Sequence, residues 1–155
     1  GGQRFEFSAN YSRLSRSEFA PVLAFVMSQR GMAETFSIVL PEISSKTGNA
    51  SGTIRASSLT AVGATAVPVD GISGVLKTGD MVKFANHAKV YMITADRSGN
   101  GSLSIEPALQ AAVANNEALT YDNVPFLARL NNDIQEYALA SASLVDYDVD
   151  FIEAV

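Results

Sequence analysis

The sequence contains no cysteine and no tryptophan, and it has one histidine, His87. Without cysteine, neither a disulfide framework nor a thiolate zinc site can form, and one histidine is too few for the usual histidine-based metal centres. Charged residues make up only 17% of the chain, and 11 basic side chains face 16 acidic ones. Because affinity for a phosphate backbone comes from lysine and arginine, this balance disfavours nucleic-acid binding as the main function.

Long hydrophobic runs are also missing. The longest nearly apolar stretch, residues 19–27, contains Pro21 and is far shorter than the roughly 20 residues that a membrane-spanning helix needs. No signal-peptide pattern is visible, and because the chain begins Gly-Gly-Gln, we expect further residues before Gly1 in the natural protein. The 155 residues are 47% apolar, which is enough for a hydrophobic core without covalent staples. Composition thus predicts a soluble globular protein and leaves its function open.

Both ends of the chain have the patterns of strands around a single helix. Residues 4–11 alternate between apolar and polar side chains, which is the period of a half-buried strand. The capping-box pattern Ser15-x-x-Glu18 predicts the start of a helix, and Gly31 is expected to be the glycine that ends it. Further strands are expected over residues 35–40, 125–130, 135–140 and 144–152.

The middle of the chain has a different texture, with many small residues and regular glycines. Residues 42–52 are predicted as a loop, residues 96–101 as a hairpin tip and residues 107–115 as a short helical turn. The short β candidates between them favour a small barrel or sandwich; they are residues 53–57, 66–69, 81–85, 88–95, 102–106 and 119–121.

We therefore predict a mainly β protein of the sandwich or barrel type with one α-helix. Residues 1–56 and 123–155 are predicted to form a discontinuous outer α+β domain, because two strands and one helix cannot close a sheet alone. Residues 57–122 are predicted to be a small β-barrel-like module inserted into it.

No catalytic constellation stands out. A Ser-His-Asp arrangement needs a histidine base, and His87 is interpreted as a turn or surface residue. Gly71-Ile72-Ser73-Gly74 is one residue short of the G-x-S-x-G nucleophile motif, and no phosphate-binding or dinucleotide-binding glycine loop is present. The sequence therefore predicts no catalytic, cofactor-binding or metal-binding residues.

Two acidic segments contain the oxygen ligands that calcium prefers. Residues 96–101 match the first half of an EF-hand loop, but Pro107 occupies the position of the final ligand, so we interpret the segment as a polar hairpin tip. Asp146, Asp148 and Asp150 alternate along a strand with a spacing of about 7 Å, which is too wide for one ion without other ligands. We interpret these aspartates as an exposed acidic face that discourages edge pairing.

A resemblance to a known group of proteins begins in the middle of the chain. The segments VLKTGDMVKF at 75–84, KVYMITAD at 89–96 and SIEPALQAAV at 104–113 resemble a β cassette found in structural proteins of tailed bacteriophages. Residues 124–130 and 147–154 are similar to the C-terminal ends of phage tail proteins that carry this cassette. The strand–helix–strand order of the outer domain resembles that of tail-tube and distal-tail ring proteins.

The resemblance implies a non-enzymatic virion protein of the phage tail or baseplate, made in the host cytoplasm. It implies a closed, six-fold homo-oligomeric ring that joins the tail tube to the hub or tip, with no cofactor, no sequence-specific nucleic acid and no membrane as partners. Independently, a chain with so little charge is expected to bury a heterologous subunit interface. A net charge of −5 would also let DNA pass such a ring without binding to it.

Three alternatives remain open at this point. The cassette that the chain resembles also occurs in head and connector proteins, and a head–tail connector or tail terminator is the first alternative. A carbohydrate-binding module of a tail tip is a second alternative. An enzyme, for example a glycosidase that uses two of the carboxylates, would require a pair of acids roughly 5–10 Å apart in a cleft.

Overall fold

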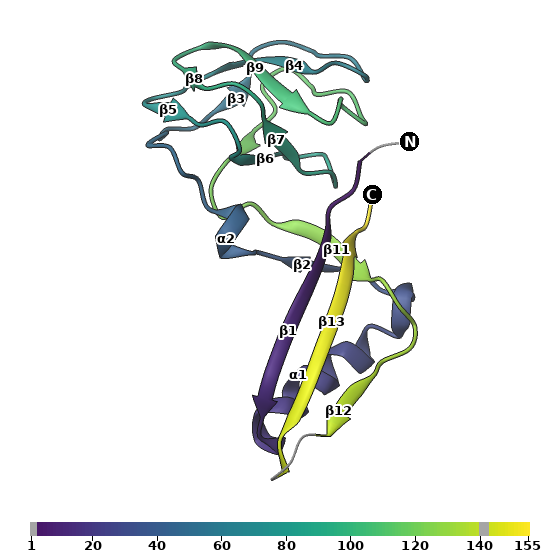
Figure 1. Ribbon diagram of the computed structural model, residues 1–155. Coiled ribbons are helices and arrows are strands. Elements are labelled where there is room, and N and C mark those ends of the chain that lie inside the picture. Colours follow the sequence, from purple (N-terminus) through teal and green to yellow (C-terminus); the bar gives the residue numbers. More distant parts are fainter. Residues whose placement is uncertain (1–2, 140–142) are drawn as a thin grey trace. The chain divides into compact units, whose positions relative to one another are not determined.

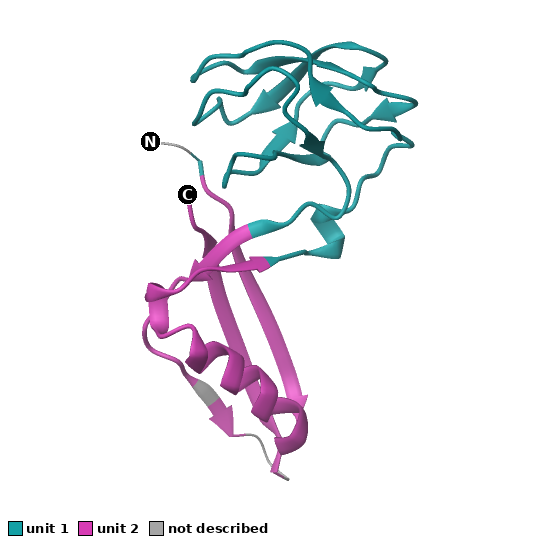
Figure 2. Ribbon diagram, turned by 180° about the vertical axis from the view of Figure 1, so that it is seen from behind, with its two compact units in different colours: residues 1–3, 38–126 teal, residues 4–37, 127–155 magenta. Residues whose placement is uncertain are grey.

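The computed structural model describes residues 3–139 and 143–155. The described chain is mostly β, as predicted, with two helices and a nearly closed, barrel-like sheet. It divides into two compact units (Figure 2). We call residues 4–37 with 127–155 the terminal unit, and residues 1–3 with 38–126 the central unit.

The terminal unit is built on two long antiparallel strands, β1 (Glu6–Leu14) and β13 (Val145–Glu153), which run side by side in Figure 1. The strand order is β1-β13-β11-β2, and β12 also pairs with β13. In this order β11 is Phe126–Leu130, β2 is Phe36–Ile38 and β12 is Tyr137–Leu139. Helix α1 (Arg16–Ser28) covers one face of the β1–β13 pair, and a short 3-10 turn, η1 (Gly31–Ala33), follows it.

The alternation of β13 explains why this sheet has one buried and one exposed face. Its apolar residues Val145, Tyr147, Val149 and Phe151 are all buried, while Asp148 and Asp150 between them are exposed. On the buried face the Phe7 and Phe151 rings lie 5.4 Å apart between centroids, and Phe19 of α1 meets Tyr147 edge-on at 5.4 Å. Aromatic pairs of this geometry add stabilisation beyond the apolar area that they bury.

The predicted start of α1 is confirmed, and its end differs by one residue. The Glu18 carboxylate accepts hydrogen bonds from the Ser15 N–H (2.9 Å) and the Ser15 hydroxyl (2.8 Å). At the other end Gln29 caps the helix, and Arg30, not Gly31, is the first residue in the left-handed conformation, with φ 53°. Gly31 follows with φ 66°, and because glycine has no β-carbon, the Asp133 carboxylate can approach its backbone closely.

The central unit is a curved six-stranded sheet in the order β10-β6-β7-β9-β4-β3. Its strands are short: β3 (Arg55–Ala56), β4 (Ala66–Asp70), β6 (Met81–Phe84), β7 (Tyr91–Ile93), β9 (Gly101–Glu106) and β10 (Leu119–Thr120). Leu119 N donates to Ile54 O (3.0 Å), and Ala56 N donates to Glu117 O (2.9 Å), so backbone hydrogen bonds nearly close the barrel between its first and last strands. A small ribbon of β5 (Val75–Leu76) and β8 (Arg97–Ser98) extends it.

One continuous hydrophobic cluster fills the central unit. Its members are almost completely buried and come from every strand of the barrel-like sheet. The larger ones include Ile54, Leu76, Phe84, Tyr91, Ile93, Leu103 and Ile105. The unit therefore has a hydrophobic core of its own, which is what distinguishes a domain from a loop excursion.

Two local predictions in the central unit are wrong. Residues 42–52 are not loop throughout, because helix α2 (Pro41–Ser44) begins just before them. Residues 107–115 form no helical turn, since Leu109 N donates to Ala64 O and Val113 N donates to Thr60 O instead of to their own segment. The expected strand over residues 135–140 is confirmed for Tyr137–Leu139, and residue 140 lies outside the described residues.

The boundaries of the compact units differ from the predicted domain boundaries. The units divide after residues 37 and 126, whereas the sequence predicted divisions after residues 56 and 122. The difference comes mainly from residues 38–56, where β3 pairs with β4 and Ala50 N donates to Val75 O (3.1 Å). The insertion of one domain into the other stays a prediction.

Candidate assembly surface

Helix α1 presents an apolar side to solvent. From Phe19 to Gln29 the helix contains no charged residue. Phe19 and Val26 of this run are buried, but Phe25 is 46% exposed and Met27 is 63% exposed. A globular helix normally turns charged or polar residues to water on this side, so the uncharged surface is typical of one that another protein covers.

An apolar groove lies at the N-terminal end of α1. It runs between α1 and the start of β13 and has a volume of about 630 Å³. Its floor includes the buried side chains of Phe19 and Val145, and exposed Leu139 and Arg16 stand at its rim. The complete lining is Arg16, Phe19, Ala20, Leu23, Leu139, Ser143, Leu144 and Val145.

An apolar protrusion lies at the opposite end of the helix. Ile134 is 67% exposed and Met32 is 37% exposed. Asp133 fixes the Ile134 loop to the end of α1, because its Oδ1 accepts a hydrogen bond from Met32 N at 2.7 Å. On the other side of Ile134, the Gln135 side-chain oxygen accepts a hydrogen bond from the Tyr147 hydroxyl (2.8 Å). Burial raises the pKa of Tyr147. The loop is therefore fixed on both sides of Ile134.

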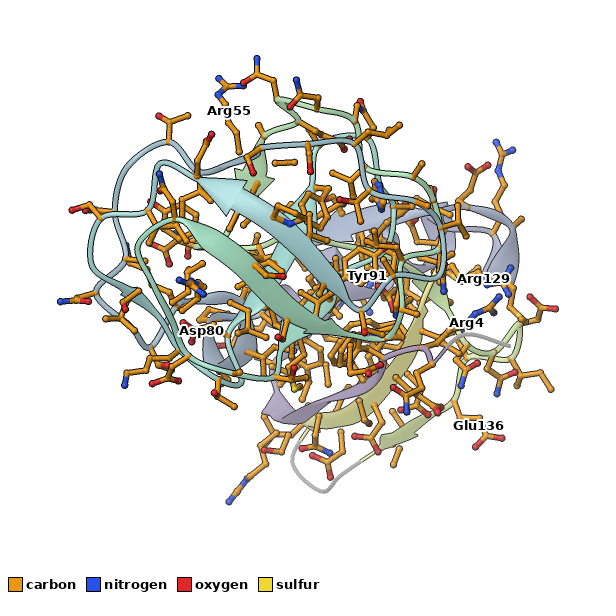
Figure 3. The ribbon with its side chains drawn as sticks, turned by 90° about the horizontal axis from the view of Figure 1, so that it is seen from above. Arg4, Arg55, Asp80, Tyr91, Arg129 and Glu136 are labelled. Carbon is orange, nitrogen blue, oxygen red and sulfur yellow. The ribbon has the colours of Figure 1, made fainter. Side chains whose placement is uncertain are left out.

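The outer face of the terminal sheet is acidic. Asp148 and Asp150 lie on the face of β13 opposite to the buried one, and both line a polar hollow of about 260 Å³ together with Ile134 and Glu136. The Glu136 side chain points away from the protein in Figure 3. Carboxylates thus surround the Ile134 protrusion.

Strand β1 ends the order of the terminal sheet. It pairs with β13 along one edge, and within residues 3–139 and 143–155 no strand pairs with its other edge. An open edge of this length presents unpaired backbone groups that can template pairing with another chain unless they are covered. This edge is a second place at which a partner is expected.

The central unit exposes two apolar side chains on a fixed loop. Leu59 is 72% exposed and Val62 is 62% exposed. Between them Thr60 forms two backbone hydrogen bonds with Val113, each of 2.9 Å, so the loop is held against the barrel.

The single histidine is not a surface residue. His87 follows the turn after β6, as expected, but it is only 6% exposed. Its Nδ1 lies 2.9 Å from the Tyr91 hydroxyl, which also accepts a hydrogen bond from Gln110 N (3.2 Å). His87 Nε2 lies 3.4 Å from Ala112 O, so His87 and Tyr91 together link the segment after β9 to β7. Within residues 3–139 and 143–155 the ring nitrogens of His87 meet no serine or carboxylate as a catalytic triad would require.

The two acidic segments weighed as calcium sites have other partners. The Asp96 carboxylate accepts hydrogen bonds from Lys77 Nζ (2.7 Å), Thr78 N (2.8 Å) and the Thr78 hydroxyl (3.0 Å), and these interactions lower the pKa of Asp96 to about 2. Asp146 Oδ1 accepts a hydrogen bond from Arg13 N (2.7 Å), and Asp148 accepts one from the Asn10 side chain. In the described part of the chain, no group of three or more histidine, aspartate or glutamate side chains is placed to hold a metal ion.

The low charge of the chain predicts a subunit interface without saying where it lies. The uncharged run in α1 is the sequence feature that marks its position. Ile134 and Leu139 carry no comparable signal, because their exposure depends on how the segment after β11 packs against α1. None of the described helices is long and apolar enough to cross a membrane.

Comparison with known proteins identifies the central unit. Residues 42–124 match a family model described as the B domain of the distal tail protein pb9. The match covers more than half of the chain and lies wholly within the central unit. No curated protein matches the chain significantly. The chain therefore belongs to the distal tail protein pb9 B-domain family and is a structural component of a bacteriophage tail.

Proposed function

We propose that this protein forms a closed homo-oligomeric ring of six subunits in the phage tail and joins the tail tube to the hub or tip. Family membership supports the tail as its location in the virion and suggests a role without catalysis. The observation that carries the ring is the uncharged, exposed side of α1, which leaves Phe25 and Met27 in water in a single chain.

A ring requires two different surfaces on each subunit. Heterologous contacts, in which one surface of a subunit binds another surface of its neighbour, close into a ring when the rotation between neighbours allows it. The terminal unit offers different candidate surfaces: the groove at one end of α1, the protrusion at the other end, and the open edge of β1. This supply of unlike surfaces favours a ring over a two-fold dimer.

The central unit is proposed to be a module inserted into the terminal unit and to include the predicted residues 57–122. Its two connections lie together, since Val124 N donates to Ser44 O at 3.0 Å. Adjacent ends of this kind allow a domain to be accommodated within another without disturbing it. The separate core of the unit supports the same proposal.

The acidity of the chain fits passage of DNA through the ring. The net charge is −5, so a ring of several copies would repel a polyanion rather than hold it. A strongly basic channel in the assembled ring would contradict this part of the proposal.

The ring is tested by the native mass of the purified chain, measured by light scattering across a concentration series. We expect one discrete mass of six subunits at high concentration. A chain that stays monomeric at every concentration would contradict a ring formed by this protein alone.

Labelling of intact particles with an antibody against the central unit tests the location of the protein. We expect label at the distal end of the tail, whereas label at the head would favour a connector or tail terminator.

A further inference from the structure

We propose that the groove at the N-terminal end of α1 binds the Ile134 protrusion of a second copy of this chain. This inference rests on the proposed ring and names the two surfaces that meet in it. It is carried by the placement of the two features, by their apolar character and by the charges at their rims.

The groove and the protrusion cannot reach each other within one chain. The groove contains Ala20, near the beginning of α1, whereas the Ile134 loop is fixed to the residues that follow the helix, through Asp133 and Met32. The eight steps of the helix from Ala20 to Ser28 alone span about 12 Å along its axis. A contact between the two features therefore requires another copy.

The groove and the protrusion are both apolar. The groove is lined mainly by apolar side chains and is open to solvent. Ile134 is an exposed β-branched side chain on a loop with fixed hydrogen bonds, so inserting it costs little conformational freedom. A burial of this kind removes apolar surface on both partners from water at once.

The charges at the two rims have opposite sign. Arg16 stands exposed at the rim of the groove, and Glu136 stands exposed two residues after Ile134. Within the described residues neither side chain forms an ion pair in its own chain. In this contact we pair Glu136 with Arg16, because a guanidinium binds a carboxylate through two parallel hydrogen bonds.

The charges also favour the Ile134 loop over the loop that exposes Leu59 and Val62. The loop that carries Leu59 and Val62 lies in residues 57–69, which contain no charged residue, and it packs on residues 107–116, which contain none either. In the Ile134 loop, by contrast, exposed Glu136 lies two residues from exposed Ile134.

A charge exchange tests the contact in the full chain. We expect Arg16→Glu to weaken subunit association about tenfold or more, because it places a carboxylate opposite Glu136. We expect Glu136→Arg in the same chain to restore most of the association. The matched control is Arg16→Glu with Glu42→Arg, which has the same net charge but places the new arginine in α2 of the central unit, where it should not restore association.

A disulfide trap provides a second, independent test, since the chain has no cysteine of its own. Bridged cysteines have α-carbons about 4.4–6.8 Å apart, so Ala20→Cys and Ile134→Cys in one chain can be joined only between copies. We expect oxidation to give a ladder of covalent multimers, and each single variant to give dimers at most.

The outcomes separate this inference from the proposed ring. A wild-type ring that Arg16→Glu leaves intact, or that yields no ladder with the cysteine pair, overturns the groove contact and leaves the ring standing. A monomeric wild-type chain overturns the ring and the contact with it. Restoration by Glu42→Arg as well as by Glu136→Arg would show that only net charge matters and would overturn the contact.

Discussion

Asp80 is the residue on which we expect the stability of the central unit to depend most strongly. Its carboxylate is 2% exposed and accepts four hydrogen bonds. Oδ1 accepts from Thr47 N (2.8 Å) and the Thr47 hydroxyl (2.6 Å), and Oδ2 accepts from Lys77 N (3.1 Å) and Gly48 N (3.4 Å). One side chain thus ties the segment after α2 to the turn before β6.

Replacement of Asp80 by alanine leaves three backbone N–H groups and one hydroxyl without their acceptor. Each unsatisfied buried donor costs about 1–3 kcal/mol, and since water can enter part of the space, we expect a loss of about 3–5 kcal/mol in total. Asp80→Asn should cost about 2–3 kcal/mol, because its NH₂ group would face the N–H groups of Lys77 and Gly48. Thr47→Val, which removes only the hydroxyl, should cost about 1–2 kcal/mol.

Hydrogen exchange followed by mass spectrometry measures these losses for the central unit separately. The amides of Ala56, Ile105 and Leu119 report the stability of the unit, because their hydrogen bonds across the barrel do not involve Asp80. A loss of 3–5 kcal/mol corresponds to a fall in protection of roughly 10²-fold to 10³-fold or more when exchange requires unfolding of the unit. The control is Asp70→Asn on β4, an exposed carboxylate whose replacement should change stability by less than about 0.5 kcal/mol.

The dependence of stability on pH gives a second test of the role of Asp80. Burial by itself would raise the pKa of Asp80, but the hydrogen bonds from Thr47, Lys77 and Gly48 outweigh it and hold the pKa below the ordinary value of 3.8. A carboxylate of this kind contributes stability above its unfolded-state pKa, and the contribution is lost as the pH falls through the folded-state pKa. Between about pH 4 and pH 2 the wild type should therefore lose more stability than Asp80→Asn. The reasoning would be refuted if the wild type and Asp80→Asn lost stability equally as the pH falls. It would also be refuted if the amides of Asp80→Ala were as protected from exchange as those of Asp70→Asn.

Three further outcomes are expected. Lys77→Met should raise the pKa of Asp96 from about 2 toward its ordinary value of 3.8, measured by NMR titration of the carboxyl carbon, because its hydrogen bond to Lys77 is the largest cause of the shift. Glu18→Ala should accelerate exchange of the Ser15 amide and of the first turn of α1, since the Glu18 carboxylate accepts that N–H. Residues 42–124 expressed alone should give a dispersed amide NMR spectrum, because the segment contains its own core and its ends lie together; a collapsed spectrum would show that the terminal unit is needed for folding.

The sequence predicted the long elements of the terminal unit well because each of them has one buried face. Residues 4–11 and 144–152 alternate with period two, and the capping box marks where α1 begins. These signals are local, so they can be read without knowledge of the rest of the chain. The same reasoning gave the mainly β class and the short strands at β4, β6 and β9.

The wrong predictions lie where hydrogen bonds to residues distant in the sequence set the backbone conformation. Residues 107–115 are rich in alanine and favour a helix by propensity, but Leu109 and Val113 donate their N–H groups to Ala64 and Thr60, more than 40 residues earlier. Tertiary hydrogen bonding here overrides intrinsic preference. Helix α2 had a local signal that was not used: Pro41 at its first position, followed by an acidic residue in the first turn.

The groove could not be predicted for the same reason. Its two walls come from α1 and from residues near the start of β13, and the Phe19 and Val145 side chains meet only after the chain has returned through more than 100 residues. The capping box predicts where α1 begins and the alternation predicts β13, but neither signal can say which apolar positions remain uncovered when the two elements pack. The exposure of Phe25 and Leu139 is a property of the assembled unit.

The distribution of basic residues adds an independent argument about which unit makes the subunit contacts. All lysines of the chain lie in the central unit, whereas every basic residue of the terminal unit is an arginine, namely Arg4, Arg13, Arg16, Arg30 and Arg129. Lysine is strongly hydrated and is depleted at protein interfaces, while arginine is enriched there because its planar guanidinium binds carboxylates in pairs and loses hydration more readily. Together with the uncharged side of α1, this division supports the proposed placement of the contacts between neighbouring copies on the terminal unit.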